Sequence, residues 1–144
     1  MHAVGHRVAG RYQLVRLLGQ GGMGSVFEAH DVRDTREGAS CAVKLLNPDS
    51  AWNPDSVRRF YREARAATAI GHPAIVQVHD VGRDDDGTPF LVMEYLPGES
   101  LAARLKRRGP VPAEQAVQVL VQVLSALEEA HRLGIVHRDV KPDN

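Results

Sequence analysis

The stretch HRDVKPDN, residues 137–144, decides how the whole chain is interpreted. Six specified residue types at fixed spacing arise by chance in about one chain in a million. Pro142 fixes its own φ, so the stretch predicts a stiff loop following a helix. The carboxylate of Asp139, the ammonium of Lys141 and the amide of Asn144 could orient a hydroxyl, neutralise a phosphoryl group and hold a divalent cation. The alternative is a polar carboxy-terminal loop without chemistry.

A glycine-rich stretch, LGQGGMGSV, occupies residues 18–26. Gly19, Gly21 and Gly24 have the spacing GxGxxG. A strand pattern precedes the stretch and another follows it, whereas a dinucleotide-binding fingerprint requires a helix after the glycines. The pattern therefore predicts a glycine-rich hairpin whose bare backbone could lie over a polyphosphate. A flexible hairpin turn without a ligand is the alternative.

A lysine on a strand and a glutamate on the following helix form a third candidate site. Lys44 ends the stretch AVK, residues 42–44, and Glu63 lies in the helix that Asn53 and Pro54 begin. We expect Glu63 to lie at the edge of the apolar stripe of that helix and to face the core, where its carboxylate would keep an inward-reaching lysine charged. The alternative is that Lys44 is a solvated strand residue.

Hydrophobic periodicity predicts a sheet containing one helix, followed by further helices, which is an α+β organisation. The last helix carries apolar residues around most of its circumference, so we expect burial on more than one side. The strands are expected at residues 12–19, 25–32, 40–46, 75–82 and 89–95, and the helices at about 54–70, 99–108 and 112–134.

Composition excludes several classes of protein. Eighteen basic residues balance eighteen acidic ones, so no excess charge indicates a nucleic-acid partner or an acidic membrane surface. The single cysteine, Cys41, has no disulfide partner or metal-binding motif and is expected to be a small core residue in a reducing cytosol. No signal peptide is visible and no apolar run approaches the ~20 residues of a membrane span, so we expect a cytoplasmic location.

The glycine loop, strand lysine, helix glutamate and HRDxKPxN occur in the order found in protein kinases. GGMGSV, REARAATAIGHPAIVQVHDVG and HRDVKPDN resemble the bacterial branch of the eukaryotic-like serine/threonine kinases. The resemblance extends from about Tyr12 to Asn144. It implies a protein-kinase-like α+β fold with an extension at residues 1–11, an N-lobe at 12–96 and the first part of a helical C-lobe at 97–144, ending in the catalytic loop.

The resemblance also assigns roles by position. Glycine backbone would cover the phosphates of ATP, and Lys44 held by Glu63 would bind the α and β phosphates. Val26 and Ala42 would pack on the adenine, and backbone groups of Glu94 and Leu96, in a hinge at residues 93–96, would bind its edge. Asp139 would accept the substrate hydroxyl proton, Lys141 would steady the γ phosphate and Asn144 would hold Mg²⁺. The residues assigned to ATP binding are Leu18, Gly19, Gly21, Gly24, Val26, Ala42, Lys44, Glu63, Glu94 and Leu96.

The implied function is ATP-dependent transfer of the γ-phosphate to a serine or threonine hydroxyl of a protein. Kinases carry a DFG motif, an activation loop and an APE motif after the asparagine, and the sequence contains none of them. Arg138 therefore lacks the phosphorylated loop residue with which it would pair. We accordingly expect the 144 residues to be a truncated, inactive and sticky part of a parent kinase. A nucleotide- or partner-binding module without catalysis and a non-functional remnant are the alternatives.

Overall fold

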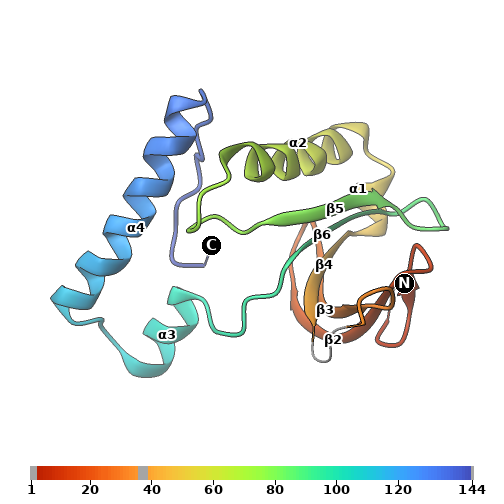
Figure 1. Ribbon diagram of the computed structural model, residues 1–144, viewed down its shortest axis with the longest axis horizontal. Coiled ribbons are helices and arrows are strands. Elements are labelled where there is room, and N and C mark those ends of the chain that lie inside the picture. Colours follow the sequence, from red (N-terminus) through yellow and green to blue (C-terminus); the bar gives the residue numbers. More distant parts are fainter. Residues whose placement is uncertain (1–2, 36–38, 144) are drawn as a thin grey trace. The chain divides into compact units, whose positions relative to one another are not determined.

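Six strands form one antiparallel sheet in the computed structural model, which describes residues 3–35 and 39–143 (Figure 1). The strand order is β1-β2-β3-β4-β6-β5. Five of the six lie where periodicity predicts them, while β1 falls in the extension and was not predicted. The bounds are β1 Arg7–Val8, β2 Tyr12–Gln20, β3 Gly24–Asp31, β4 Ser40–Leu46, β5 Val78–Arg83 and β6 Pro89–Glu94.

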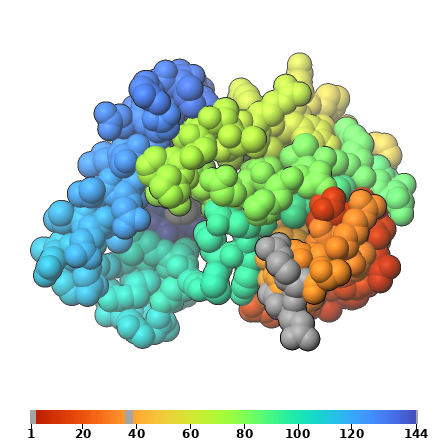
Figure 2. Space-filling view, in the orientation of Figure 1, coloured from red at the N-terminus to blue at the C-terminus, as the bar shows by residue number. Residues whose placement is uncertain are grey.

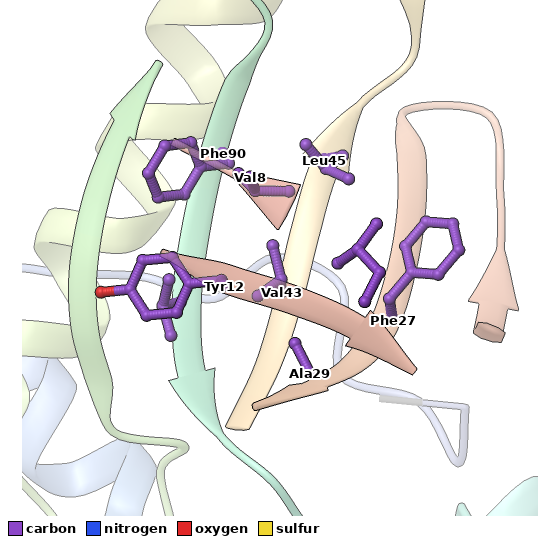
Figure 3. Close-up of a cluster of buried hydrophobic side chains, with 9 residues drawn as sticks. Val8, Tyr12, Phe27, Ala29, Val43, Leu45 and Phe90 are labelled. Carbon is purple, nitrogen blue, oxygen red and sulfur yellow. The ribbon is translucent and has the colours of Figure 1, made fainter. Parts of the chain in front are cut away.

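One face of the sheet forms the larger hydrophobic core (Figure 3). Side chains alternate between the two faces along each strand, so Phe27 of β3, Val43 and Leu45 of β4 and Phe90 of β6 point to the same side. Val8 of β1 is completely buried among them. The short strand of the extension therefore contributes to the core of the sheet.

Helix α2, Pro54–Ile70, covers the opposite face of the sheet. Its buried residues Phe60 and Ala64 pack with Leu46 of β4 and Leu91 of β6. The Asn53 side chain caps the helix as the sequence predicts, since its Oδ1 accepts hydrogen bonds from the backbone N–H groups of residues 55 and 56. A short helix that was not predicted, α1 at Pro48–Ala51, connects β4 to this cap.

Polar side chains around the start of β2 contact residues of β3 and β5. The Arg11 guanidinium donates to both carboxylate oxygens of Asp31, with Nη2 2.7 Å from Oδ2, and the Tyr12 hydroxyl donates to Asp80 over 2.5 Å. The hydrogen bond from Arg11 holds the pKa of Asp31 below its usual value. Desolvation, together with the bond to Asp80, raises the pKa of Tyr12. These polar contacts connect strands that are distant in sequence.

The chain divides into two units, of which the sheet and most of α2 form the first, Met1–Ala69 with Val76–Leu96. The second comprises Ile70–Ile75 and Pro97–Asn144 and contains α3, Leu101–Arg108, and α4, Ala113–Arg132. Within it, the His72 ring lies 3.1 Å from the hydroxyl of Ser125. The boundaries that the resemblance implies between the extension, the N-lobe and the C-lobe remain predictions.

Helix α4 begins and ends as its sequence indicates, but its burial differs from expectation. Gly134, at a φ of 73°, ends it with the hydrogen bonds of a Schellman motif, Gly134 N–H to the His131 carbonyl and Ile135 N–H to the Ala130 carbonyl. Burial on more than one side is wrong for this chain, because Ala126 and Ala130 are the only buried residues of α4 and several of its apolar side chains are exposed. The exposed residues include Val117, Leu120, Val121 and Leu124.

None of the helices within residues 3–35 and 39–143 combines the length and apolar character that a bilayer crossing requires.

Candidate active site

Lys44 and Glu63 meet on the face of the sheet that α2 covers. The Nζ of Lys44 lies 3.6 Å from Oε2 of Glu63 and 5.7 Å from the centroid of the Phe60 ring. The lysine side chain is 25% exposed, and the aromatic ring adds a favourable cation–π contact. The predicted pair is therefore present as a close ion pair in the first unit.

Glu63 lies at the edge of the apolar stripe, as expected, but the expectation that it faces the core is wrong. Its side chain is 51% exposed, although Phe60 and Ala64 on the same helix are buried. Glu63 precedes Ala64 on the helix and lies at the margin of the buried stripe, so its carboxylate reaches Lys44 from the solvent side. The carboxylate orients the ammonium while both groups retain access to water.

Two residues assigned to the adenine lie on the same face as Lys44. In the antiparallel ladder, Val26 of β3 is the partner of Lys44, and Ala42 lies two residues before Lys44 on the same strand. Ala42 is buried and Val26 is half-buried. Met93 of β6 is the ladder partner of Ala42. The sheet thus places an apolar surface beside the lysine.

The three glycines of the GxGxxG spacing occupy different environments. A Cβ on Gly19 or Gly21 would have no heavy atom within 4 Å, so the backbone there is bare and open to a ligand. Gly24 is buried, and a Cβ there would lie 2.2 Å from the carbonyl oxygen of Leu45. Gly24 is required because β3 and β4 approach closely, a role that the sequence spacing did not indicate.

The hairpin that contains these glycines is held by hydrogen bonds. The Gly21 N–H donates to the Gly24 carbonyl over 2.9 Å and closes the turn. The Asn47 side chain donates to the carbonyl oxygens of Gly21 and Gly22. No sequence motif pointed to Asn47, since only the fold brings it to the hairpin. The open space around this glycine backbone, beside the strand that carries Lys44, could accommodate a polyphosphate.

The hinge residues are placed at the end of β6. The Glu94 N–H donates to the Gln77 carbonyl, and the Glu94 carboxylate accepts a hydrogen bond from the Gln77 N–H, each over a distance of 2.8 to 2.9 Å. Leu96, after the strand, is 59% exposed, and Leu18 of β2 is 39% exposed. The Glu94 N–H is thus already paired with protein.

Residues 137–143 of the HRDVKPDN stretch form a loop in the second unit. The Nζ of Lys141 lies 2.8 Å from Oδ2 of Asp139, and this hydrogen bond raises the pKa of Lys141. The Pro142 carbonyl accepts a hydrogen bond from the Ala102 N–H of α3 over 2.8 Å, which anchors the loop to a helix. Arg138 has a φ of 66°, a left-handed conformation uncommon outside glycine. The carboxylate and ammonium predicted to act together are in direct contact.

The predicted magnesium ligand, Asn144, lies outside the described residues. Within them, three or more histidine, cysteine, aspartate or glutamate side chains nowhere gather as a metal-binding cluster.

A cavity of about 570 Å³ lies between α2 and β5, whose surfaces adjoin in the space-filling view (Figure 2). Tyr61, Ala64, Thr68 and Val81 are among the residues that line it. The residues assigned to ATP and to catalysis are not part of its lining. The candidate site is therefore distinct from this cavity.

Comparison with known proteins places these features in a family. Residues 12–144 match the protein kinase domain model. The chain is 41% identical over 141 residues to the serine/threonine-protein kinase PrkC of Bacillus subtilis, covering 98% of this chain and 21% of that protein. It is 43% identical over 145 residues to the serine/threonine-protein kinase PknA of Mycobacterium tuberculosis, covering 98% and 33%.

A solved structure agrees with these sequence relatives. The crystal structure of the PknI kinase domain from M. tuberculosis has a TM-score of 0.81 at 34% identity and covers 100% of this chain and 56% of that one. The chain thus spans a fifth to a third of the length of the curated relatives named above, and just over half of the solved kinase domain. The expected kinase-like α+β fold is confirmed, and the chain belongs to the protein kinase domain family.

Proposed function

We propose that the chain supplies the ATP-binding lobe and the catalytic loop of a serine/threonine protein kinase. The reaction is transfer of the γ-phosphate of ATP to a serine or threonine hydroxyl of a protein substrate. The observation that carries the proposal is the 3.6 Å ion pair between Lys44 of β4, a strand next to the glycine hairpin, and Glu63 of α2. An oriented ammonium beside bare backbone suits a polyphosphate better than a neutral ligand.

The nucleotide roles follow from position in the first unit. Lys44 binds the α and β phosphates, and Glu63 keeps its ammonium oriented. Val26 and Ala42, together with Leu18, supply the apolar surface for adenine, while backbone groups of Glu94 and Leu96 bind its polar edge. Because the Glu94 N–H already donates to Gln77, we assign the Glu94 contact to its carbonyl oxygen. Gly19 and Gly21, which carry no side chain, leave space for the phosphates beside the hairpin.

The loop of the second unit supplies the groups that act on the hydroxyl. The Asp139 carboxylate accepts the hydroxyl proton while the new oxygen–phosphorus bond forms and the bond from the γ-phosphorus to the bridging oxygen of ADP breaks. Lys141, 2.8 Å from that carboxylate, offsets negative charge on the γ-phosphate. Asn144 is proposed to hold Mg²⁺, which supplies charge neutralisation at the phosphates when bound.

The partners and the location follow from the reaction. The proposed partners are ATP and a protein bearing serine or threonine, and use of ATP favours a cytoplasmic location for this part of the protein. We further propose that the 144 residues on their own do not transfer phosphate.

Two measurements test the proposal. ATP is titrated into the 144-residue chain, and binding of ATP in preference to adenosine is expected. The complete gene product is then incubated with γ-labelled ATP and a serine/threonine-containing protein, and Asp139→Asn is expected to reduce transfer by about 10³-fold or more. Equal transfer by wild type and Asp139→Asn would contradict the assignment. Binding of ATP without transfer by the complete product would favour a nucleotide-binding module.

A further inference from the structure

Asn47 holds the glycine hairpin, although it belongs to none of the motifs discussed so far. It directly follows β4, and its side-chain Nδ2 donates to the Gly21 carbonyl at 3.0 Å and to the Gly22 carbonyl at 3.2 Å. Its backbone N–H donates to the Met23 carbonyl, also at 3.0 Å. Three successive carbonyl groups of the hairpin are thus directed at one residue.

These hydrogen bonds fix the orientation of two peptide planes. In a trans peptide the N–H points opposite to the C=O of the same plane, and the described chain contains no cis peptide. The plane of the Gly21 carbonyl contains the Gly22 N–H, and the plane of the Gly22 carbonyl contains the Met23 N–H. Both N–H groups therefore point away from Asn47.

The two N–H groups are available to a ligand. Neither donates a hydrogen bond to any atom of the part of the chain that the structure describes. A Cβ placed on Gly21 or Gly22 would have no neighbour within 4 Å, so the space around this backbone is open. Successive backbone N–H groups directed to one side of a turn are a recurrent anion-binding arrangement.

A helix-capping role does not account for the Asn47 side chain. Asn47 is the N-cap residue of α1, but its side chain makes no capping hydrogen bond. The start of α1 is instead held by the Asn47 backbone carbonyl, which accepts from the N–H groups of Ser50 and Ala51. Replacing the side chain would leave these backbone contacts in place.

We propose that Asn47 is a positioning residue for nucleotide binding. By fixing the two peptide planes, it presents the N–H groups of Gly22 and Met23 to phosphate oxygens of ATP, without touching the nucleotide itself. Glycine backbone can adopt many conformations. Fixing its conformation before ATP binds therefore lowers the conformational-entropy cost of binding. The inference rests on the proposed nucleotide-binding function.

An NMR titration of the ¹⁵N-labelled 144-residue chain with ATP, and separately with adenosine, tests the proposal. ATP should shift the amide signals of Gly22 and Met23, and adenosine should not. Asn47→Ala should raise the Kd for ATP about five- to tenfold and the Kd for adenosine less than twofold. Asn47→Asp should have at least the same effect, because a carboxylate cannot donate to the two carbonyls.

A matched control and a second readout separate positioning from general damage. Asp49→Ala alters an exposed residue of the same corner, two positions away, and should leave both Kd values unchanged. Without any nucleotide, the Gly21 amide, which donates to the Gly24 carbonyl, should exchange with solvent about five times faster in Asn47→Ala than in wild type. Unchanged exchange would contradict a positioning role.

The outcomes distinguish this inference from the function on which it rests. If wild type prefers ATP and Asn47→Ala binds ATP equally well, the role of Asn47 is overturned and nucleotide binding stands. Equal weakening of ATP and adenosine binding also overturns it, because the effect would then not act through the phosphates. If wild type shows no preference for ATP over adenosine, the proposed function fails, and the inference fails with it.

Discussion

Gly24 and Leu45 approach so closely that a Cβ added to Gly24 would lie 2.2 Å from the Leu45 carbonyl oxygen. Gly24 is the ladder partner of Leu46, the residue that follows Leu45 on β4. A side chain at this position would have to push the two strands apart. The last glycine of the GxGxxG spacing is thus a requirement of the sheet itself.

Gly24→Ala is therefore expected to destabilise the fold, by about 2–4 kcal/mol in the free energy of unfolding. Gly22→Ala is the matched control, because nothing lies within 4 Å of its Cβ position, and it should change stability by less than about 1 kcal/mol. Urea denaturation followed by circular dichroism measures both. Equal stability of the two variants would show that β3 and β4 can separate without cost.

Lys44→Met should lower the affinity for ATP by about tenfold or more, since it removes a charged donor to phosphate. Glu63→Gln should lower the affinity for ATP less, by about two- to threefold. The Glu63 carboxylate is half-exposed, so solvent partly screens its attraction to the Lys44 ammonium. Calorimetric titration with ATP measures both variants, and Lys106→Met on the exposed surface of α3 is the control. An unchanged ATP affinity in Lys44→Met would remove the main support for the nucleotide site.

Arg11→Ala should lower the midpoint of urea unfolding at pH 7 by roughly 0.5 M, because it removes the donor to Asp31. The folded-state pKa of Asp31 is lowered, so the contribution of this pair is present above about pH 4 and is lost as the pH falls through the folded-state value. The difference between variant and wild type should therefore shrink between pH 7 and pH 2.5. Arg16→Ala, which breaks the more exposed pair with Glu28, should have the smaller effect at pH 7. A larger effect for Arg16→Ala would refute this ranking.

Cys41 should react slowly with thiol reagents in the folded protein. Partial burial raises the pKa of its thiol to about 11, so at pH 8 only about one thiol in a thousand is ionised. The neutral thiol is favoured in the folded state, so its contribution to stability is present below about pH 9 and is lost as the pH rises through about 11. Alkylation of Cys41 at pH 8 should be about a hundredfold slower in the folded chain than in denaturant. A midpoint near pH 8.5 for the labelling of Cys41 in the folded chain would be inconsistent with its burial.

Local sequence patterns were sufficient for much of the fold. Alternating residues predicted five of the six strands, and Asn53 with Pro54 predicted the start of α2, because strand pleat and helix capping depend on residues that are close in sequence. The order of the motifs was also sufficient to predict the protein kinase family. Strand β1 escaped prediction because two residues are too short for a period and are held by pairing with β2.

Tertiary structure decided what the individual residues of the site do. Glu63 reaches Lys44 from a half-exposed position, since helical periodicity places a residue at the edge of the apolar stripe but does not determine how exposed it is once α2 packs on the sheet. A side chain at Gly24 would collide with β4, about twenty residues further along the chain. Asn47 binds a hairpin more than twenty residues before it. Each relationship depends on residues that are far apart in sequence and become neighbours only when the sheet forms, which is why the motifs predicted the chemistry but not the contacts that position it.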